Sequence, residues 1–303
     1  MIQNPARLSL SKGQLRLEND GGVNTLPLED VTALILESPQ ITLSSALLSA
    51  CQESAVALIT CDATHIPNGV LLPFQPHSRQ SRVAYIQQSW SEPLRKRLWQ
   101  RVVQTKINNQ ASCLEAARGD GSGERLYALA RRVASGDPDN IEAQAARDYF
   151  PRLYGAEFNR GSQSVINAAL NYGYAVVRAF VARSQIAYGL IPAFGIHHAN
   201  DLNAFNLTDD LMEVFRPMVD WQVVLMLQDG LGETARDGLL TKEFRQILAN
   251  IGNALCAIKG DTHTIANAAD AMAASLVSAI EKKDATLLIL PEFVRLSYED
   301  ALR

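Results

Sequence analysis

The chain has 303 residues, 47% of them hydrophobic and 20% charged, and this composition is typical of a globular protein with roughly two domains. Its net charge is −4 and its sequence pI is about 5.8, which argues mildly against a nucleic-acid-binding protein, because such proteins usually carry a basic surface. The longest unbroken apolar runs fall far short of the ~20 residues of a membrane helix and no secretion signal begins the chain, so we expect a soluble, cytoplasmic protein with no membrane partner.

The four cysteines are scattered along the chain and form no Cys-x-x-Cys pair. Zinc knuckles and thiol redox motifs both need that close spacing, so the pattern favours neither. Isolated cysteines are typical of buried thiols in a reducing compartment, which agrees with an intracellular protein.

The first 72 residues have the pattern of a small β domain. Leucines alternate with polar residues on both sides of Lys12-Gly13, which predicts a hairpin. Two short apolar runs predict buried strands, and a segment between them has apolar residues at helical spacing after a Ser/Thr start. The predicted elements are the hairpin at 7–20, the strands at 31–38 and 55–62, and one embedded helix at 41–54.

Prolines and a glycine interrupt the pattern after this domain, and we expect a linker over 73–84. Helical periodicity dominates from 85 to 303, which predicts a larger all-helical domain and an α+β fold class for the whole chain. The clearest helix is 162–190, which is so apolar that it should be buried. Further helices are predicted at 243–258 and 270–282.

The segment 195–217 gathers two adjacent histidines, several acids and an apolar run that ends in Arg-Pro. Asp210 and Glu213 are three residues apart, so a helix there would place both carboxylates on one face. Two interpretations stay open for this segment. The acids either complement a helix dipole in its first turn, or join His197 or His198 in holding a divalent ion such as Mg²⁺ or Mn²⁺.

A third acid, Glu142, follows a turn and N-cap signal at 137–140 and lies in an alanine-rich segment. The alanines would let another part of the backbone come close. Glu142 is therefore either a glutamate that complements its helix dipole or a further candidate ligand.

Seven basic residues and three aromatic ones lie between residues 79 and 106, against a single acid. Such a stretch is commonly the solvated face of a surface helix, and the alternative is a set of phosphate contacts on a nucleic acid. The candidate DNA-binding residues are Arg79, Arg82, Arg95, Lys96, Arg97, Arg101 and Lys106.

Five stretches, in their order and spacing, carry a resemblance to a known family. They are QNPARLSL near the start, NIEAQAARDYFPRLYG, INAALNYGYAVVRA, GIHH and DDLMEVFRP. With them the chain resembles, over essentially its whole length, the CRISPR-associated integrase of the spacer-acquisition (adaptation) machinery, in the short form found in type II systems.

The resemblance implies a small N-terminal β domain and a larger helical domain that is the catalytic one. It implies a metal-dependent DNA endonuclease and integrase that inserts new spacers into a CRISPR array by 3′-hydroxyl transesterification, as part of antiviral defense. Glu142, His198 and Glu213 match the family's metal ligands for Mg²⁺ or Mn²⁺, and Asp210 matches its auxiliary catalytic acid. His197 has no counterpart with a role.

The resemblance also implies partners. These are DNA, as spacer precursor and repeat array, a second copy of the chain bound through the N-terminal β domain, and the small second protein of the acquisition complex. A contact with the type II effector nuclease is left open.

Two other functions stay open as alternatives. His197, His198 and Glu213 could form a two-histidine, one-carboxylate iron site on an unrelated helical enzyme. Alternatively the chain is a nucleic-acid-binding subunit without catalysis, in which case loss of Glu142 would leave every activity intact.

Overall fold

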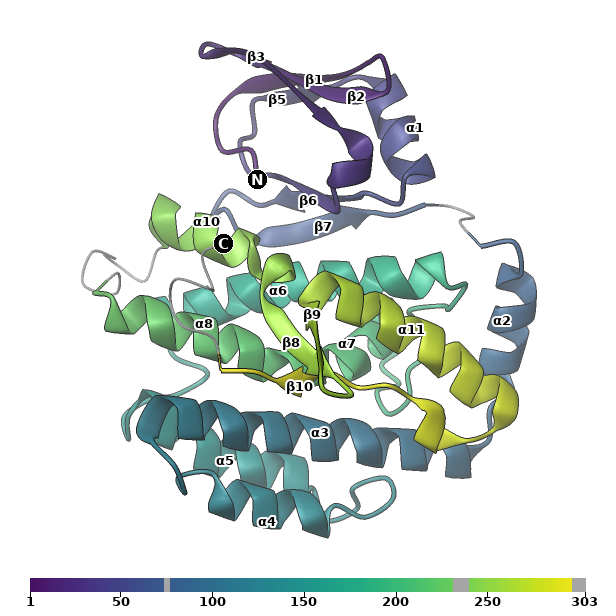
Figure 1. The fold of residues 1–303 in the computed structure, drawn as a ribbon, viewed down its shortest axis with the longest axis vertical. Coiled ribbons are helices and arrows are strands. Elements are labelled where there is room, and N and C mark those ends of the chain that lie inside the picture. The colour runs from purple at the N-terminus through teal and green to yellow at the C-terminus, as the bar shows by residue number, and fades with distance from the viewer. Residues whose placement is uncertain (74–76, 231–239, 296–303) are drawn as a thin grey trace.

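Two small β-sheets form the N-terminal part of the structure, a computed structural model that describes residues 1–73, 77–230 and 240–295. One sheet has four strands in the order β3-β2-β1-β5, and the other has three in the order β4-β6-β7. The four-stranded sheet lies at one end of the molecule, away from the large helical part that follows (Figure 1). The elements are β1 (Ala6–Ser11), β2 (Gln14–Asn19), β3 (Gly22–Pro27), η1 (Leu28–Asp30), β4 (Ala33–Leu36), β5 (Ile41–Leu43), α1 (Ser45–Glu53), β6 (Ala57–Cys61) and β7 (Pro67–Leu71).

The predicted first hairpin is confirmed. β1 and β2 pair antiparallel, with Leu8 opposite Leu17 on the two strands. Lys12 and Gly13 form the two-residue turn and have φ values of 51° and 77°, the left-handed backbone that such hairpin turns require.

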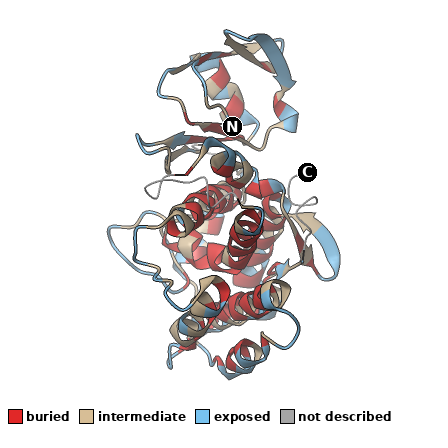
Figure 2. Cartoon of the chain, turned by 90° about the vertical axis from the view of Figure 1, so that its left-hand side faces the viewer, coloured by how far each residue is buried: buried red, intermediate tan, exposed pale blue. Residues whose placement is uncertain are grey.

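The embedded helix is confirmed as α1. The hydroxyl of Ser44 accepts a hydrogen bond from the N–H of Leu47 and so caps the helix start. Leu47 and Cys51 are fully buried and pack into a small core with Leu8 of β1 and Leu58 of β6. This core is separate from the much larger one between the helices, where buried residues are concentrated (Figure 2).

Helices make up most of the remaining chain, as the α+β fold class predicted. They are α2 (Gln80–Gln88), α3 (Glu92–Arg118), α4 (Glu124–Arg132), α5 (Ile141–Tyr154), α6 (Val165–Ala187), α7 (Asn206–Met212), η2 (Glu213–Phe215), α8 (Arg216–Gln228), α10 (Lys242–Ala249), η3 (Ile251–Asn253), α11 (Ile265–Lys282) and η4 (Ala285–Leu287).

The long apolar helix expected within 162–190 is α6, and it is the central helix of this part. By length and composition α6 could cross a membrane, but 67% of its most apolar window is buried inside the protein, so it is a core helix. A Cβ on Gly173 would lie only 2.4 Å from the side chain of Val219, which shows how closely α6 and α8 approach each other.

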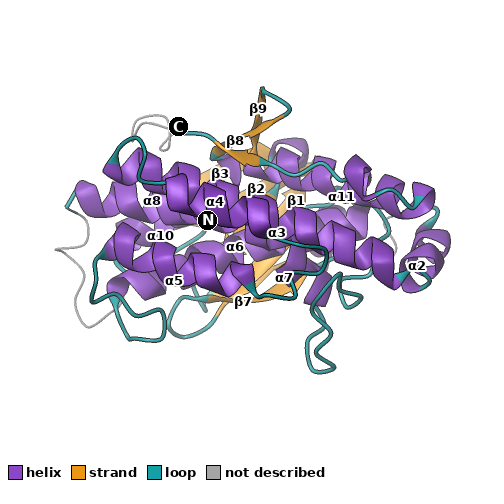
Figure 3. Ribbon diagram, turned by 90° about the horizontal axis from the view of Figure 1, so that it is seen from below, coloured by secondary structure: helices purple, strands orange, loops and turns teal. Residues whose placement is uncertain are grey.

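The helical part also contains a three-stranded sheet that the sequence interpretation missed. It has the order β10-β8-β9, with β8 (Leu255–Ile258), β9 (Asp261–Thr264) and β10 (Glu292–Phe293). Its hairpin projects from one edge of the helices (Figure 3). The helix predicted over 243–258 therefore ends early, in α10 and η3, and its last four residues are β8.

A recognisable signal marked this hairpin. Lys259 and Gly260 have φ values of 52° and 90°, so they repeat the Lys-Gly turn of the first hairpin. The helix predicted at 270–282 is confirmed as the later part of α11.

The predicted linker, 73–84, overlaps a helix. Residues 74–76 lie outside the described residues, and α2 already begins at Gln80. The three-stranded sheet before this segment packs on α6, and its residues Ile35 and Ile59 belong to the core of the helical part.

Pro217 shapes the element that carries the candidate acids. In a continuous α-helix the carbonyl of Glu213 would accept a hydrogen bond from the N–H of residue 217, which proline lacks. The N–H of Arg216 donates to the Glu213 carbonyl instead, in a 3₁₀ turn. The chain thus continues from α7 through η2 into α8, with Glu213 at the change of geometry.

Candidate functional site

The start of α5 fixes the position of Glu142. The side chain of Asn140 accepts a hydrogen bond from the N–H of Ala143, and the carboxylate of Asp137 accepts from the N–H groups of Ile141 (2.9 Å) and Glu142 (3.0 Å). The expected turn and N-cap are therefore present. With two acceptors already on its first turn, α5 does not depend on Glu142 for capping.

Asp210 holds the histidine loop in place. Its side chain is fully buried, and its two oxygens accept hydrogen bonds from the N–H groups of Ile196 (2.5 Å), His197 (2.9 Å) and His198 (3.2 Å). A Cβ at Gly195 would lie 2.1 Å from the His198 carbonyl oxygen, so the loop closes this tightly only with glycine there. Asp210 is thus a buried anchor and not a solvated acid of a first turn.

The two histidines are used differently. The Nδ1 of His198 lies 2.6 Å from Asp210 Oδ1, and this hydrogen bond raises the pKa of the imidazole above its ordinary value. The ring of His197 lies flat on Trp99, with 4.4 Å between ring centroids and 4° between ring planes. The planes of the His197 and His198 rings are 84° apart, so these two adjacent side chains have different orientations.

Glu213 is held between two positive charges. Only 8% of its side chain is exposed, and Arg216 Nε donates to its Oε1 at 2.7 Å. Lys106 Nζ lies 2.5 Å from its Oε2. Burial alone would raise the pKa of Glu213, but Lys106 and Arg216 together lower it to about 2, so the carboxylate is charged.

Lys106 joins the two glutamates. Its Nζ lies 2.5 Å from Glu142 Oε1 as well as from Glu213. Burial alone would lower the pKa of this ammonium, but Glu213 and Glu142 raise it above its ordinary value. Two acids from distant parts of the sequence therefore meet on one buried cation.

The predicted ligand residues fit a hard divalent ion in their chemistry. Two carboxylates and one imidazole are suitable donors for Mg²⁺ or Mn²⁺. Oε2 of Glu213 is buried and faces a cation, the Lys106 ammonium 2.5 Å away, so it already lies where positive charge is held. Within the described ranges, 1–73, 77–230 and 240–295, no three His, Cys, Asp or Glu side chains already form a group that could hold a metal ion.

The basic stretch is divided by the fold. Arg79 and Arg82 belong to the start of α2, whereas the other five lie on α3. Lys96 and Arg97 are exposed, and Arg101 is half-buried and donates to the carbonyl of Leu288. The prediction that Lys106 lies on a solvated or DNA-facing surface is wrong, because Lys106 is only 8% exposed and is paired with two acids.

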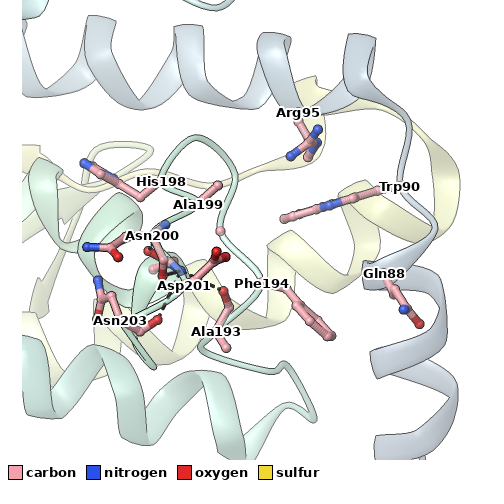
Figure 4. A pocket seen from close by; sticks show the side chains of 12 residues that line it. Gln88, Trp90, Arg95, Ala193, Phe194, His198, Ala199, Asn200, Asp201 and Asn203 are labelled. Carbon is pink, nitrogen blue, oxygen red and sulfur yellow. Dashed lines mark hydrogen bonds between the residues drawn. The ribbon is translucent and has the colours of Figure 1, made fainter.

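A pocket of about 490 Å³ opens beside His198. Arg95 and Trp90 lie on one side of it, with His198 and Asn200 on the other (Figure 4). Phe194 also lines it and is 40% exposed. The pocket gives access from solvent to the histidine loop.

Sequence reasoning missed the place of Lys106, although a signal existed. Leu98, Val102 and Val103 are core residues of α3, and Lys106 follows them at the same helical spacing. A lysine at a core position needs an acid as its partner, and this one has two, the buried Glu213 and the partly exposed Glu142.

The chain is similar to proteins of one family. The model of the family described as "CRISPR associated protein Cas1" matches residues 1–250. The CRISPR-associated endonuclease Cas1 of Neisseria meningitidis serogroup C is 39% identical over 296 residues, which cover 98% of this chain and 96% of that protein. A CRISPR-associated endonuclease Cas1 of Pyrobaculum aerophilum is 28% identical over 264 residues, covering 80% and 85%.

Three solved structures have a similar fold. A casposase bound to its integration product has a TM-score of 0.78 at 17% identity and covers 98% of this chain and 95% of that one. A Cas1 protein from Thermotoga maritima has a TM-score of 0.70 at 15% identity, with 92% and 96% covered. A Cas6-RT-Cas1–Cas2 complex has a TM-score of 0.72 at 18% identity, with 97% of this chain and 36% of that one covered.

Proposed function

Because the chain belongs to the CRISPR-associated Cas1 family, we propose that it is a divalent-metal-dependent DNA endonuclease and integrase that inserts new spacers into a CRISPR array. The observation that carries the proposal is the meeting of Glu142 and Glu213 on one buried cation, beside a histidine anchored by Asp210. Carboxylates brought together in this way are costly unless positive charge is bound between them.

Glu142, Glu213 and His198 would hold Mg²⁺ or Mn²⁺. Once bound, the ion would polarise the scissile phosphate and favour the alkoxide form of the attacking 3′ hydroxyl. Asp210 accepts from Nδ1 of His198, which leaves Nε2 as the ligand atom and fixes the orientation of the ring. Arg216 holds the other oxygen of Glu213, Oε1, and is a permanent counter-charge to it.

The reaction we propose is a transesterification. The 3′ oxygen of a spacer end forms a bond to the phosphorus atom at the 5′ edge of a repeat strand, and the bond from that phosphorus to the 3′ oxygen of the flanking nucleotide breaks. One phosphodiester replaces another, so no nucleotide triphosphate is consumed. The reverse reaction uses the same residues.

Partners and place follow from the same proposal. The partners are spacer-precursor DNA, the repeat array, a second copy of the chain and a Cas2-type small protein, as the name of the Cas6-RT-Cas1–Cas2 complex indicates for that assembly. The type II effector nuclease is a further candidate partner, and the place is the cytoplasm. The four-stranded sheet offers an edge strand for self-association, β3, which exposes Val23 (52%) and Leu26 (44%).

The apolar run at 31–38 does not need a second copy to cover it, because Leu34 and Ile35 are already buried within one chain. The iron alternative has no observation in its favour, since His197 is stacked on Trp99. The other alternative, a nucleic-acid-binding subunit without catalysis, likewise has no support from the fold or from the paired glutamates.

The test is strand joining in vitro. Purified protein, its small partner, short duplex DNA and a supercoiled array plasmid are incubated with Mg²⁺ or Mn²⁺, and joined strands are measured on a gel. Glu142→Gln, which keeps the side-chain volume, should join no strands. Joining by Glu142→Gln at the wild-type rate would refute the proposed site.

A further inference from the structure

Lys106 lies at the place where the proposed site needs a cation. It is on α3, its side chain is 10% exposed, and its Nζ is 2.5 Å from both Glu142 Oε1 and Glu213 Oε2. A buried ammonium is stable only when it is paired, and here both partners are residues assigned above as ligands. The pairing is therefore more than a surface ion pair.

The charges balance without a metal. Glu142 and Glu213 contribute two negative charges, and Lys106 and Arg216 contribute two positive ones. Oxygens bind Mg²⁺ at about 2.1 Å, so an ion on the same two oxygens would lie within a few ångströms of Nζ. Two cations that close repel each other strongly in a site with little water.

One further acceptor for an ammonium lies along the same helix. Gln110 lies one helical turn further along α3, and side chains four residues apart on a helix are neighbours. The Oε1 of Gln110 is buried and has no hydrogen-bond partner among the described residues. It is an available acceptor on the same helix as Lys106.

We propose that Lys106 is a resident counter-ion of the site: its ammonium holds Glu142 and Glu213 together in the metal-free protein, and it moves away toward Gln110 when the divalent ion binds. Lys106 thereby lowers the affinity of the site for the ion, in exchange for a preformed carboxylate pair. This inference rests on the proposed function, which assigns both glutamates as ligands.

The direct test is Mn²⁺ binding to the full chain, measured by isothermal titration calorimetry. Lys106→Met removes the competing charge and should bind Mn²⁺ roughly ten-fold tighter or more. Lys106→Arg keeps the charge and should not gain affinity. Lys282→Met removes an exposed lysine from the last turn of α11, outside the proposed metal and DNA sites, and should bind Mn²⁺ as the wild type does. Equal or weaker binding by a folded Lys106→Met would overturn the inference.

A second measurement follows Lys106 in the wild-type protein itself. In wild-type protein with ¹³C-labelled lysine, the Cε signal of Lys106 should shift when Mg²⁺ is added to saturation, with Lys106→Arg used to assign the signal. An unshifted signal at saturation would overturn the inference.

Glu142→Gln separates the two levels of the proposal. If wild-type protein binds Mn²⁺ and Glu142→Gln binds it more weakly, the assignment of Glu142 as a ligand stands. If Lys106→Met then binds Mn²⁺ no more tightly than the wild type does, only the proposed role of Lys106 is refuted. If Glu142→Gln binds Mn²⁺ as well as the wild type does, the proposed metal site fails and the role of Lys106 fails with it.

Discussion

Oδ1 of Asp210 lies 2.6 Å from Nδ1 of His198, and the same carboxylate accepts hydrogen bonds from the backbone N–H groups of Ile196, His197 and His198. One buried acid thus orients the ring and also closes the loop that carries it. This gives Asp210 two roles that can be separated by substitution.

Asp210→Ala should lose both roles. It would leave the buried N–H of Ile196 and the part-buried N–H groups of His197 and His198 without this acceptor. A buried unsatisfied donor costs about 1–3 kcal/mol, so the free energy of unfolding should fall by at least about that amount. Asp210→Asn keeps one acceptor oxygen and the volume, and should retain more of the stability while losing strand joining. Urea unfolding and the joining assay measure the two effects. An Asp210→Asn protein with full activity would show that orientation of His198 does not matter.

The two histidines should respond in opposite ways. His198→Ala should lower strand joining by more than the 10–100-fold that is typical for loss of a ligand's supporting partner. His197→Ala should leave joining nearly intact but lose the stacking on Trp99, at a cost of about 0.5–1.5 kcal/mol in the free energy of unfolding. Strand-joining rates and thermal melting of the two variants test these roles. Our assignment of the pair is wrong if the activities are reversed.

The exposed basic residues of α3 should bind DNA phosphates. Lys96→Gln combined with Arg97→Gln should weaken DNA binding equally for all sequences, and should lower the salt slope by about one for each phosphate that is no longer neutralised. Lys12→Gln removes one exposed positive charge from the first hairpin, away from α3, and is the control that should leave the slope unchanged. Binding is measured by fluorescence anisotropy from low to moderate salt. An unchanged slope in the double variant would make these residues an ordinary solvated face.

Asp220 should make stability depend on pH. Burial raises its pKa from 3.8 to about 6, although the hydroxyls of Tyr174 and Tyr149 donate to it. Because the folded-state pKa is the higher one, its stabilising contribution is complete below about pH 4 and is lost as the pH rises to about 6. Across that window the loss is on the order of 3 kcal/mol.

Asp220→Asn is the test of this dependence, since the amide stays neutral at every pH. The free energy of unfolding of the variant, relative to wild type, should increase between pH 4 and pH 7 in urea titrations. A difference that is constant over this range would mean that Asp220 does not titrate there.

Periodicity in the sequence predicted the elements with local signals. The Lys12-Gly13 turn, the buried α6 and the cap before α5 all depend on residues close together in the chain, and each is present in the structure. The second Lys-Gly turn, at 259–260, was available in the same way and was missed because an apolar run before it also fits a helix. A short apolar run fits a strand as well as a helix, so it does not distinguish between them.

The site depended on information of another kind. Glu142, His198 and Glu213 were indicated by a family resemblance, because no local pattern brings together residues up to 71 positions apart. The role of Lys106 needed three dimensions: helical spacing places it among core residues, but only the fold shows which acids it meets. Its neighbours in the sequence, Arg97 and Arg101, have no such partners among the ion pairs of the described residues.

The packing of Ile35 and Ile59 against the helices has a practical consequence for anyone who wishes to shorten the protein. A truncated chain that starts at residue 73 would uncover the face of α6 on which β6 and β7 lie. It would also lack Glu37, the ion-pair partner of Arg245. The guanidinium of Arg245, which is only 13% exposed, would then have lost this carboxylate. A shortened chain therefore has to retain the sheet β4-β6-β7. Because β5 and α1 lie between β4 and β6 in the sequence, no single cut can remove the four-stranded sheet and keep this one whole.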